Sequence, residues 1–191
     1  VVNVHHFANQ ITDYLDAHHY GVDIYVSDET EQLLDTGGGI KRAASLFNRQ
    51  LPVLIHNVDI LSNVDLAAFY RHALEIKADA LLLVSRRVTQ RYLIFDSNMR
   101  LVGWTNVATG EVKSPHDEIR QLHFVSPTDA ESSYFQHSCY LCAFSGIHVL
   151  APSAVQAVEA VDEDKFPIME FYLNNCDRLD IRGELKTDLH L

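Results

Sequence analysis

Two neighbouring stretches decide the fold, LLDTGGGIKRAASLF at residues 33–47 and PVLIHNVD at residues 52–59. Three consecutive glycines predict a loop, and the apolar spacing from Ile40 to Phe47 predicts a helix that begins directly after it. The apolar run from Pro52 to His56 is typical of a short buried strand, and Asp59 follows its carboxyl end. In open α/β sheets, ligands bind at the carboxyl ends of strands, so we expect the glycines and Asp59 to meet there.

Strands and helices alternate along the chain on both sides of these stretches. Val1 to His5 predicts a strand, residues 7–18 predict a helix packed on it, and the alternating Val22, Ile24 and Val26 predict a second strand. A strand–helix–strand unit implies parallel strands with a right-handed crossover. Further on we expect a helix at 64–75 with a capping box formed by Ser62 and Asp65, strands at 80–84, 143–150 and 179–185, a hairpin at 92–104, and helices at 152–161 and 167–176. Early alternation followed by a hairpin predicts an α/β fold with a mixed sheet.

Composition limits the classes of partner. The chain has 191 residues, 47% hydrophobic and 21% charged, which suits one globular domain with a sizeable core. A formal net charge of −11 disfavours nucleic acid, although a local pocket with Mg²⁺ can still bind a small phosphorylated ligand. No apolar run is long enough to predict a membrane span, and three cysteines do not make a disulfide framework, so we expect a cytoplasmic protein.

The glycine stretch is the first candidate binding site. Glycine allows the main chain to approach a ligand closely, and amides ahead of a helix that begins at Ile40 would bind an anion or a nucleobase. The stretch is neither GxGxxG nor a Walker A loop, because no Lys-Ser/Thr follows it. The alternative, favoured by the local sequence alone, is a tight turn that joins a strand to a helix.

Asp59 is the candidate metal ligand. A carboxylate at the end of a strand is well placed to hold Mg²⁺ against phosphates, because hard cations prefer oxygen ligands. An aspartate in a turn before the next helix is an equally good interpretation.

Two further patterns indicate packing instead of chemistry. Cys139 and Cys142 have the spacing of a zinc or redox motif, but no second such pair exists and Cys142 belongs to an expected buried strand. The adjacent histidine pairs at residues 5–6 and 18–19 point apart, and no HExxH motif is present, so we expect surface or strand-end histidines.

Taken in order, four segments resemble the sugar nucleotidyltransferase family, the NDP-sugar pyrophosphorylases: VVNVHHFANQI (1–11), LLDTGGGIKRA (33–43), PVLIHNVDIL (52–61) and FSGIHVL (144–150). Members that it resembles include the mannose-1-phosphate guanylyltransferase-like proteins and the N-acetylmuramate 1-phosphate uridylyltransferases. The resemblance covers nearly all of residues 1–191. It implies a single nucleotidyltransferase domain over 1–191, with a Rossmann-like α/β fold whose mixed, mostly parallel sheet is flanked by helices.

The resemblance also implies a reaction and its residues. Thr36, Gly37 and Gly38 match the segment that lies against the nucleobase, Asp59 matches the aspartate that binds Mg²⁺, and Ser145 and Gly146 match the strand that lines the sugar pocket. The implied enzyme transfers a nucleoside monophosphate from GTP or UTP to a sugar 1-phosphate, which yields an NDP-sugar and pyrophosphate. No residue is assigned as the catalytic group itself.

The chain departs from the family pattern in three places. The glycine-rich loop with Arg and Lys that grips the triphosphate would precede Val1, and the second metal aspartate would follow the last strand, where Asp188 lacks the motif's context. Val58 replaces the glycine that is common before the metal aspartate. We therefore expect the first strand and both elements to be missing and this chain alone to be inactive. Further residues, a complementing chain or a partner in a homo-oligomer would fill the empty place in the sheet. The alternative function is a non-catalytic regulatory domain of the same fold that binds a nucleotide or sugar nucleotide.

Overall fold

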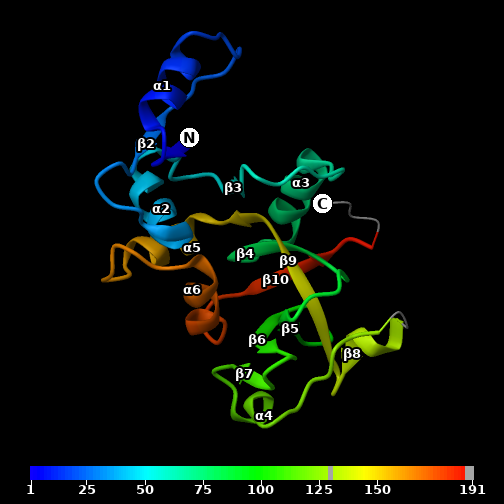
Figure 1. Cartoon of the computed structure of the whole chain (residues 1–191). Helices are drawn as coiled ribbons and strands as arrows, with labels where there is room; N and C mark the ends of the chain where they lie inside the picture. The colour runs from blue at the N-terminus through cyan, green and yellow to red at the C-terminus, as the bar shows by residue number, and fades with distance from the viewer. Residues whose placement is uncertain (129–130, 188–191) are drawn as a thin grey trace. The chain divides into compact units, whose positions relative to one another are not determined.

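The computed structural model describes residues 1–128 and 131–187, and the chain forms two compact units (Figure 1). Unit 1 comprises Val1–Gln50 and Val155–Phe171, and unit 2 comprises Leu51–Ala154 and Tyr172–Leu191. The chain leaves unit 2 within helix α5 (Pro152–Glu159) and re-enters it within helix α6 (Ile168–Asn175). Asp188 lies outside the described residues. The single domain over residues 1–191 stays a prediction.

Unit 1 begins with the expected strand–helix–strand unit. Strand β1 (Val2–Val4), helix α1 (Ala8–Asp16) and strand β2 (Val26–Asp28) follow one another, and β1 pairs with β2 in parallel. The predicted second strand was placed too early, because it begins at Val26 and Val22 is 72% exposed. The register explains the shift, since Val26 is the residue that lies opposite Val2.

The glycine stretch is helical, so the predicted loop and the helix start at Ile40 were both wrong. Helix α2 runs from Asp35 to Ala43 and ends in a 3₁₀ turn, η1 (Ala44–Leu46). Gly37, Gly38 and Gly39 are buried in its first two turns. Glycine is a poor helix former, so tertiary contacts hold this segment in the helix.

Unit 2 is built on a mixed sheet centred on β9 (Cys139–Leu150). Its strand order is β10–β4–β9–β5–β6–β7, and β3 and β8 also pair with β9. Strands β3 and β4 are both antiparallel to β9, and β10 is parallel to β4, so these three strands run in one direction. The α/β class with a mixed sheet is thereby confirmed. The other strands of the unit are β3 (Val53–His56), β4 (Ala80–Ser85), β5 (Arg91–Phe95), β6 (Leu101–Asn106), β7 (Glu111–Lys113), β8 (Phe135–Gln136) and β10 (Ile181–Leu185).

Helices cover this sheet. Helix α3 (Leu66–Ile76) buries Phe69 against Leu83 and Ile147, which lie on β4 and β9. His148, the residue after Ile147 on β9, contacts Tyr172 of α6. Side chains alternate across a strand, so α3 and the part of α6 that begins at Tyr172 lie on opposite faces of the sheet.

Helix α3 is capped by Asp65, whose side chain accepts a hydrogen bond from the Ala68 amide at 2.9 Å, so the predicted Ser62 cap was wrong.

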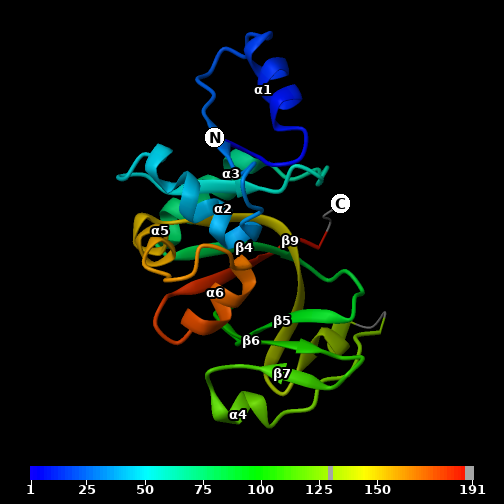
Figure 2. The same cartoon turned by 60° about the vertical axis from the view of Figure 1, so that its left-hand side comes forward.

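Two smaller helices complete the unit. Between residues 114 and 136, where the sequence predicted nothing, the structure has α4 (Asp117–Arg120) beside β7 (Figure 2) and the 3₁₀ helix η2 (Glu131–Tyr134). Within the described ranges, no helix is both long and apolar enough to cross a bilayer.

Candidate functional site

The three glycines allow α2 to pack tightly within unit 1. A Cβ atom on Gly37 would lie 2.4 Å from the Phe166 ring, and one on Gly38 would lie 2.1 Å from the main-chain oxygen of Asp164. On Gly39 it would lie 2.8 Å from Glu29 Oε1 and 2.9 Å from Asn3 Nδ2. These approaches are shorter than real Cβ contacts. Packing against main-chain oxygens by itself explains Gly37 and Gly38, whereas the neighbours of Gly39 are the ends of side chains.

The polar groups at the start of α2 already have protein partners. The amides of Gly37 and Gly38 donate to the Phe166 carbonyl at 2.9 and 3.2 Å. The Thr36 amide donates to Asp35 Oδ1 at 2.7 Å, and the Thr36 hydroxyl accepts from the Ile168 amide at 3.0 Å. The nucleobase role of Thr36, Gly37 and Gly38 stays a prediction, and in this structure a ligand would find their amide hydrogens engaged.

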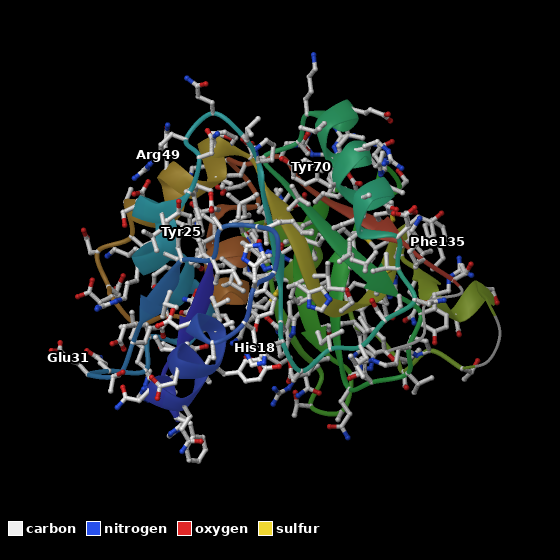
Figure 3. All side chains as sticks on the ribbon, turned by 90° about the horizontal axis from the view of Figure 1, so that it is seen from above. His18, Tyr25, Glu31, Arg49, Tyr70 and Phe135 are labelled. Atoms are coloured by element: carbon white, nitrogen blue, oxygen red, sulfur yellow. The ribbon has the colours of Figure 1, made fainter. Side chains whose placement is uncertain are left out.

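A cavity of about 530 Å³ opens in unit 1 beside the same helix. At the edge of this cavity, the ammonium group of Lys41 already has protein partners. Its Nζ donates to the Val161 and Glu163 carbonyls and to Asp164 Oδ1, at 2.8, 3.2 and 3.1 Å. The exposed Glu31, labelled in Figure 3, is also at this cavity. Of the predicted nucleobase residues, Gly38 lines it. The full lining is Glu31, Gln32, Leu34, Gly38, Lys41, Arg42 and Asp164.

Asp59 lies in a turn at the carboxyl end of β3, as the sequence predicted. The Ile60 amide donates to the Asn57 carbonyl at 3.3 Å and closes the turn. Val58, at its tip, is 98% exposed, and Asp59 is exposed too. Asp59 has no hydrogen-bond or ion-pair partner among the described residues. Its carboxylate is therefore open to a ligand.

Ser145 and Gly146 lie in an irregular part of β9 beside this turn. The pairing of β4 with β9 shifts register between Leu82 and Val84, and the Ser145 hydroxyl donates to the Leu83 carbonyl at 2.7 Å. Ser145 is 3% exposed. On the other side, the Asn57 amide donates to the Gly146 carbonyl at 3.2 Å. The sugar-binding role of both residues stays a prediction. In this structure the Ser145 hydroxyl is buried and bonded to the Leu83 carbonyl.

Unit 2 thus brings together two of the predicted sites, the Asp59 turn and the Ser145–Gly146 segment. Asn57 joins them, and the sequence analysis did not single it out. Its place two residues before Asp59 was the available signal. The glycine helix belongs to unit 1, so its expected proximity to Asp59 stays a prediction.

The donor set suits a metal that arrives with a phosphorylated ligand. Among the described residues, no group of three His, Cys, Asp or Glu side chains could hold a metal ion. Magnesium is usually held by one or two carboxylates together with substrate phosphates, not by a cage of protein ligands. One open carboxylate at Asp59 fits that arrangement, and the Mg²⁺ assignment stays a prediction.

The buried titratable groups of unit 2 serve packing. The three cysteines are free and buried, and burial raises the pKa of Cys142 to about 12 and that of Cys176 to about 11. These thiols stay protonated at neutral pH, which makes them poor metal ligands and nucleophiles. Burial lowers the pKa of His148 to about 3, so its imidazole is neutral where it meets the Tyr172 hydroxyl.

Solved structures identify the fold. HddC from Yersinia pseudotuberculosis superposes with a TM-score of 0.64 and 16% identity over 98% of this chain and 69% of that chain. The same protein complexed with GMP-PN gives 0.59 at 14% identity, over 96% of this chain and 68% of that one. The inositol-1-phosphate CTP transferase from T. maritima gives 0.64 at 12% identity, over 100% and 67%. These likenesses show the Rossmann-like fold of the nucleotidyltransferases.

A curated relative narrows the resemblance. The chain is 44% identical over 62 residues to the N-acetylmuramate alpha-1-phosphate uridylyltransferase of Caulobacter vibrioides. The match spans 31% of this chain and 25% of that protein. No family model matches the chain. The predicted resemblance to the sugar nucleotidyltransferases is confirmed.

Proposed function

We propose that this protein takes part in nucleotidyl transfer from a nucleoside triphosphate to a sugar 1-phosphate, with an NDP-sugar and pyrophosphate as products. The observation that carries the proposal is the open carboxylate of Asp59 at the end of β3, in a chain with the nucleotidyltransferase fold. An exposed aspartate without a protein partner is available to a metal–nucleotide complex. The stretch of 62 residues that is 44% identical to the uridylyltransferase supports the same chemistry.

The reaction consists of an in-line attack by a phosphate oxygen of the sugar 1-phosphate on the α-phosphorus of the nucleotide. The bond to the β-phosphate oxygen breaks, and pyrophosphate leaves. The chain's own contribution is to hold reactants in line, because positioning supplies much of the acceleration in such transfers. When bound, Mg²⁺ offsets the charge that builds on the phosphate oxygens.

The nucleotide and the sugar remain a choice among a few candidates. The resemblance suggests GTP or UTP, and the name of the Caulobacter protein favours UTP with N-acetylmuramate 1-phosphate. We place the enzyme in the cytoplasm, where nucleoside triphosphates and sugar phosphates are available.

The first experiment is a pyrophosphate-release screen with Mg²⁺. UTP, GTP and CTP are each paired with N-acetylmuramate, mannose and inositol 1-phosphates, using the protein with its sheet completed by further residues or a partner chain, as wild type and as Asp59→Asn. We expect release with one nucleotide and one sugar phosphate, reduced about 100-fold in Asp59→Asn. Release at the same rate in both proteins would refute the role of Asp59, and no release with any pair would count against the proposed transfer.

We further propose that β3 gains a second strand partner from further residues, a complementing chain or a homo-oligomer. Among the described strands, β3 pairs with β9 alone, and Val53, Leu54 and Ile55 are only partly buried. Such an edge presents main-chain groups and apolar surface to other strands. Intact-mass measurement and light scattering test this. A monomer of 21.6 kDa in solution would contradict it.

A further inference from the structure

The turn that carries Asp59 packs on the main chain of Ser145 and Gly146 in β9, which is far away in the sequence and is called the platform below. The pairing of β3 with β9 ends at His56 opposite Ile147, and the chain then turns. The next contact continues the ladder by a single hydrogen bond, from the Asn57 amide to the Gly146 carbonyl at 3.2 Å. The turn that carries Asp59 therefore begins on Gly146.

Gly146 has a conformation and surroundings that suit glycine alone. Its φ is +78°, in the left-handed region that L residues rarely adopt. A Cβ atom there would lie 2.4 Å from Ile60 Cδ1 and 2.9 Å from Asn57 Nδ2. Both contacts are with residues of the turn, so Gly146 is where the turn packs against β9.

The platform is fixed on its other side as well. Ser145 bonds the Leu83 carbonyl at the register shift between β4 and β9, which ties the bulge to β4. Ile60, at the end of the turn, packs against the buried cluster formed by α3, β4 and β9. Both ends of the turn are thus anchored, and Val58 and Asp59 at its tip are exposed.

We infer that Gly146 is a positioning residue for Asp59: the left-handed bulge of β9 sets where this carboxylate meets a metal–nucleotide complex. The inference rests on the proposed function, and it gives Gly146 a role that differs from lining a sugar pocket. Ser145 shares this role through its hydroxyl, which is buried and bound to β4. A shift of about 1 Å in a reacting group can lower turnover about 100-fold, so this platform matters to rate.

The test compares Gly146→Ala with Gly110→Ala. Gly110 also has a positive φ, +75°, but the nearest atom to its Cβ would be His123 Cε1 at 3.9 Å. Both variants carry the same kind of backbone cost, and Gly146→Ala alone disturbs the turn. Amide exchange of Asn57 and Ile60 is measured by NMR. We expect the exchange of these amides to be about tenfold faster in Gly146→Ala, since the strained main chain at residue 146 must shift. In Gly110→Ala we expect the same exchange rates as in wild type. Unchanged exchange in Gly146→Ala would overturn the inference.

The second arm measures binding of Mn²⁺ with UTP or GTP by electron paramagnetic resonance. We expect Gly146→Ala to weaken Mn²⁺–nucleotide binding about tenfold and to have no further effect in an Asp59→Asn background. A full effect of Gly146→Ala in that background would show that Gly146 acts independently of Asp59 and would overturn the inference. If wild-type protein binds no Mn²⁺–nucleotide while Gly146→Ala still loosens the turn, the proposed function fails and the placement of Asp59 by Gly146 stands.

Discussion

Replacing Gly38 with alanine separates a packing role for the glycines of α2 from a ligand-binding role. The new methyl group would lie 2.1 Å from the Asp164 carbonyl oxygen and 3.0 Å from Leu34 Cβ. A main-chain oxygen cannot rotate away, so the segment around Asp164 or the helix must move by about 1 Å. That movement would strain the hydrogen bonds of the Gly37 and Gly38 amides to Phe166.

The expected cost follows from three opposing effects. Alanine favours the helix over glycine by about 1 kcal/mol. Overpacking costs about 2 kcal/mol, and the two weakened hydrogen bonds cost about 1 kcal/mol each. Gly38→Ala should therefore lower the free energy of unfolding by about 3 kcal/mol. In a chain of 191 residues this corresponds to a fall in Tm of about 6–12 °C.

Gly39→Ala is the matched control on the same helix. Its methyl group would meet the ends of two side chains, Glu29 and Asn3, which can rotate at the cost of their mutual hydrogen bond. Rotation also weakens the bond from Asn3 to the Gly39 carbonyl and the bond from the Leu34 amide to Glu29. The helix gain of about 1 kcal/mol offsets part of this loss of up to about 3 kcal/mol, so we expect a net cost of at most about 2 kcal/mol, less than that of Gly38→Ala.

Thermal unfolding followed by circular dichroism at 222 nm measures both variants, and hydrogen exchange over residues 34–46 locates the effect in α2. The reasoning is refuted if Gly38→Ala is as stable as wild type. Packing would then not explain the glycine, and close approach of a ligand would become the better explanation.

Three further predictions concern unit 2. Asp59→Asn should reduce pyrophosphate release about 100-fold and shift Tm by about 1 °C or less, since the exposed carboxylate has no protein partner in the described structure. Because the pKa of His148 is lowered to about 3, the unfolded chain alone binds its proton between pH 3 and about 6.5, so stability falls with falling pH. At pH 4.5 the loss approaches about 3 kcal/mol, and urea unfolding of His148→Leu should show a correspondingly weaker pH dependence. Burial raises the pKa of Cys142 to about 12 and that of Cys176 to about 11, so a thiol reagent at pH 8 should modify the folded protein slowly; rapid titration of either thiol would contradict this.

The sequence predicted the types of most elements, because apolar periodicity reflects which face of a segment is buried. The first strand–helix–strand unit, the hairpin of β5 and β6, and the long strand β9 are all present. Its errors were at boundaries and caps. Asp65, not Ser62, caps α3. Strand β2 begins at Val26 because its register with β1 sets that position.

The candidate site was predictable to a similar extent. Asp59 does follow a strand in an exposed turn, as the order of residues indicated. The glycine stretch was misread as a loop, because local propensity cannot register the close approach of Phe166 and Asp164, more than 120 residues away.

By itself, the sequence determined the α/β class, the place of Asp59 after a strand, and the resemblance to sugar nucleotidyltransferases. The tertiary structure decided what the glycines do: those of α2 make room for packing, and Gly146 supports the turn of Asp59. The division has one physical reason. Periodicity and turn chemistry act between near neighbours in the chain. The effect of a missing Cβ instead depends on atoms that only folding brings within 3 Å.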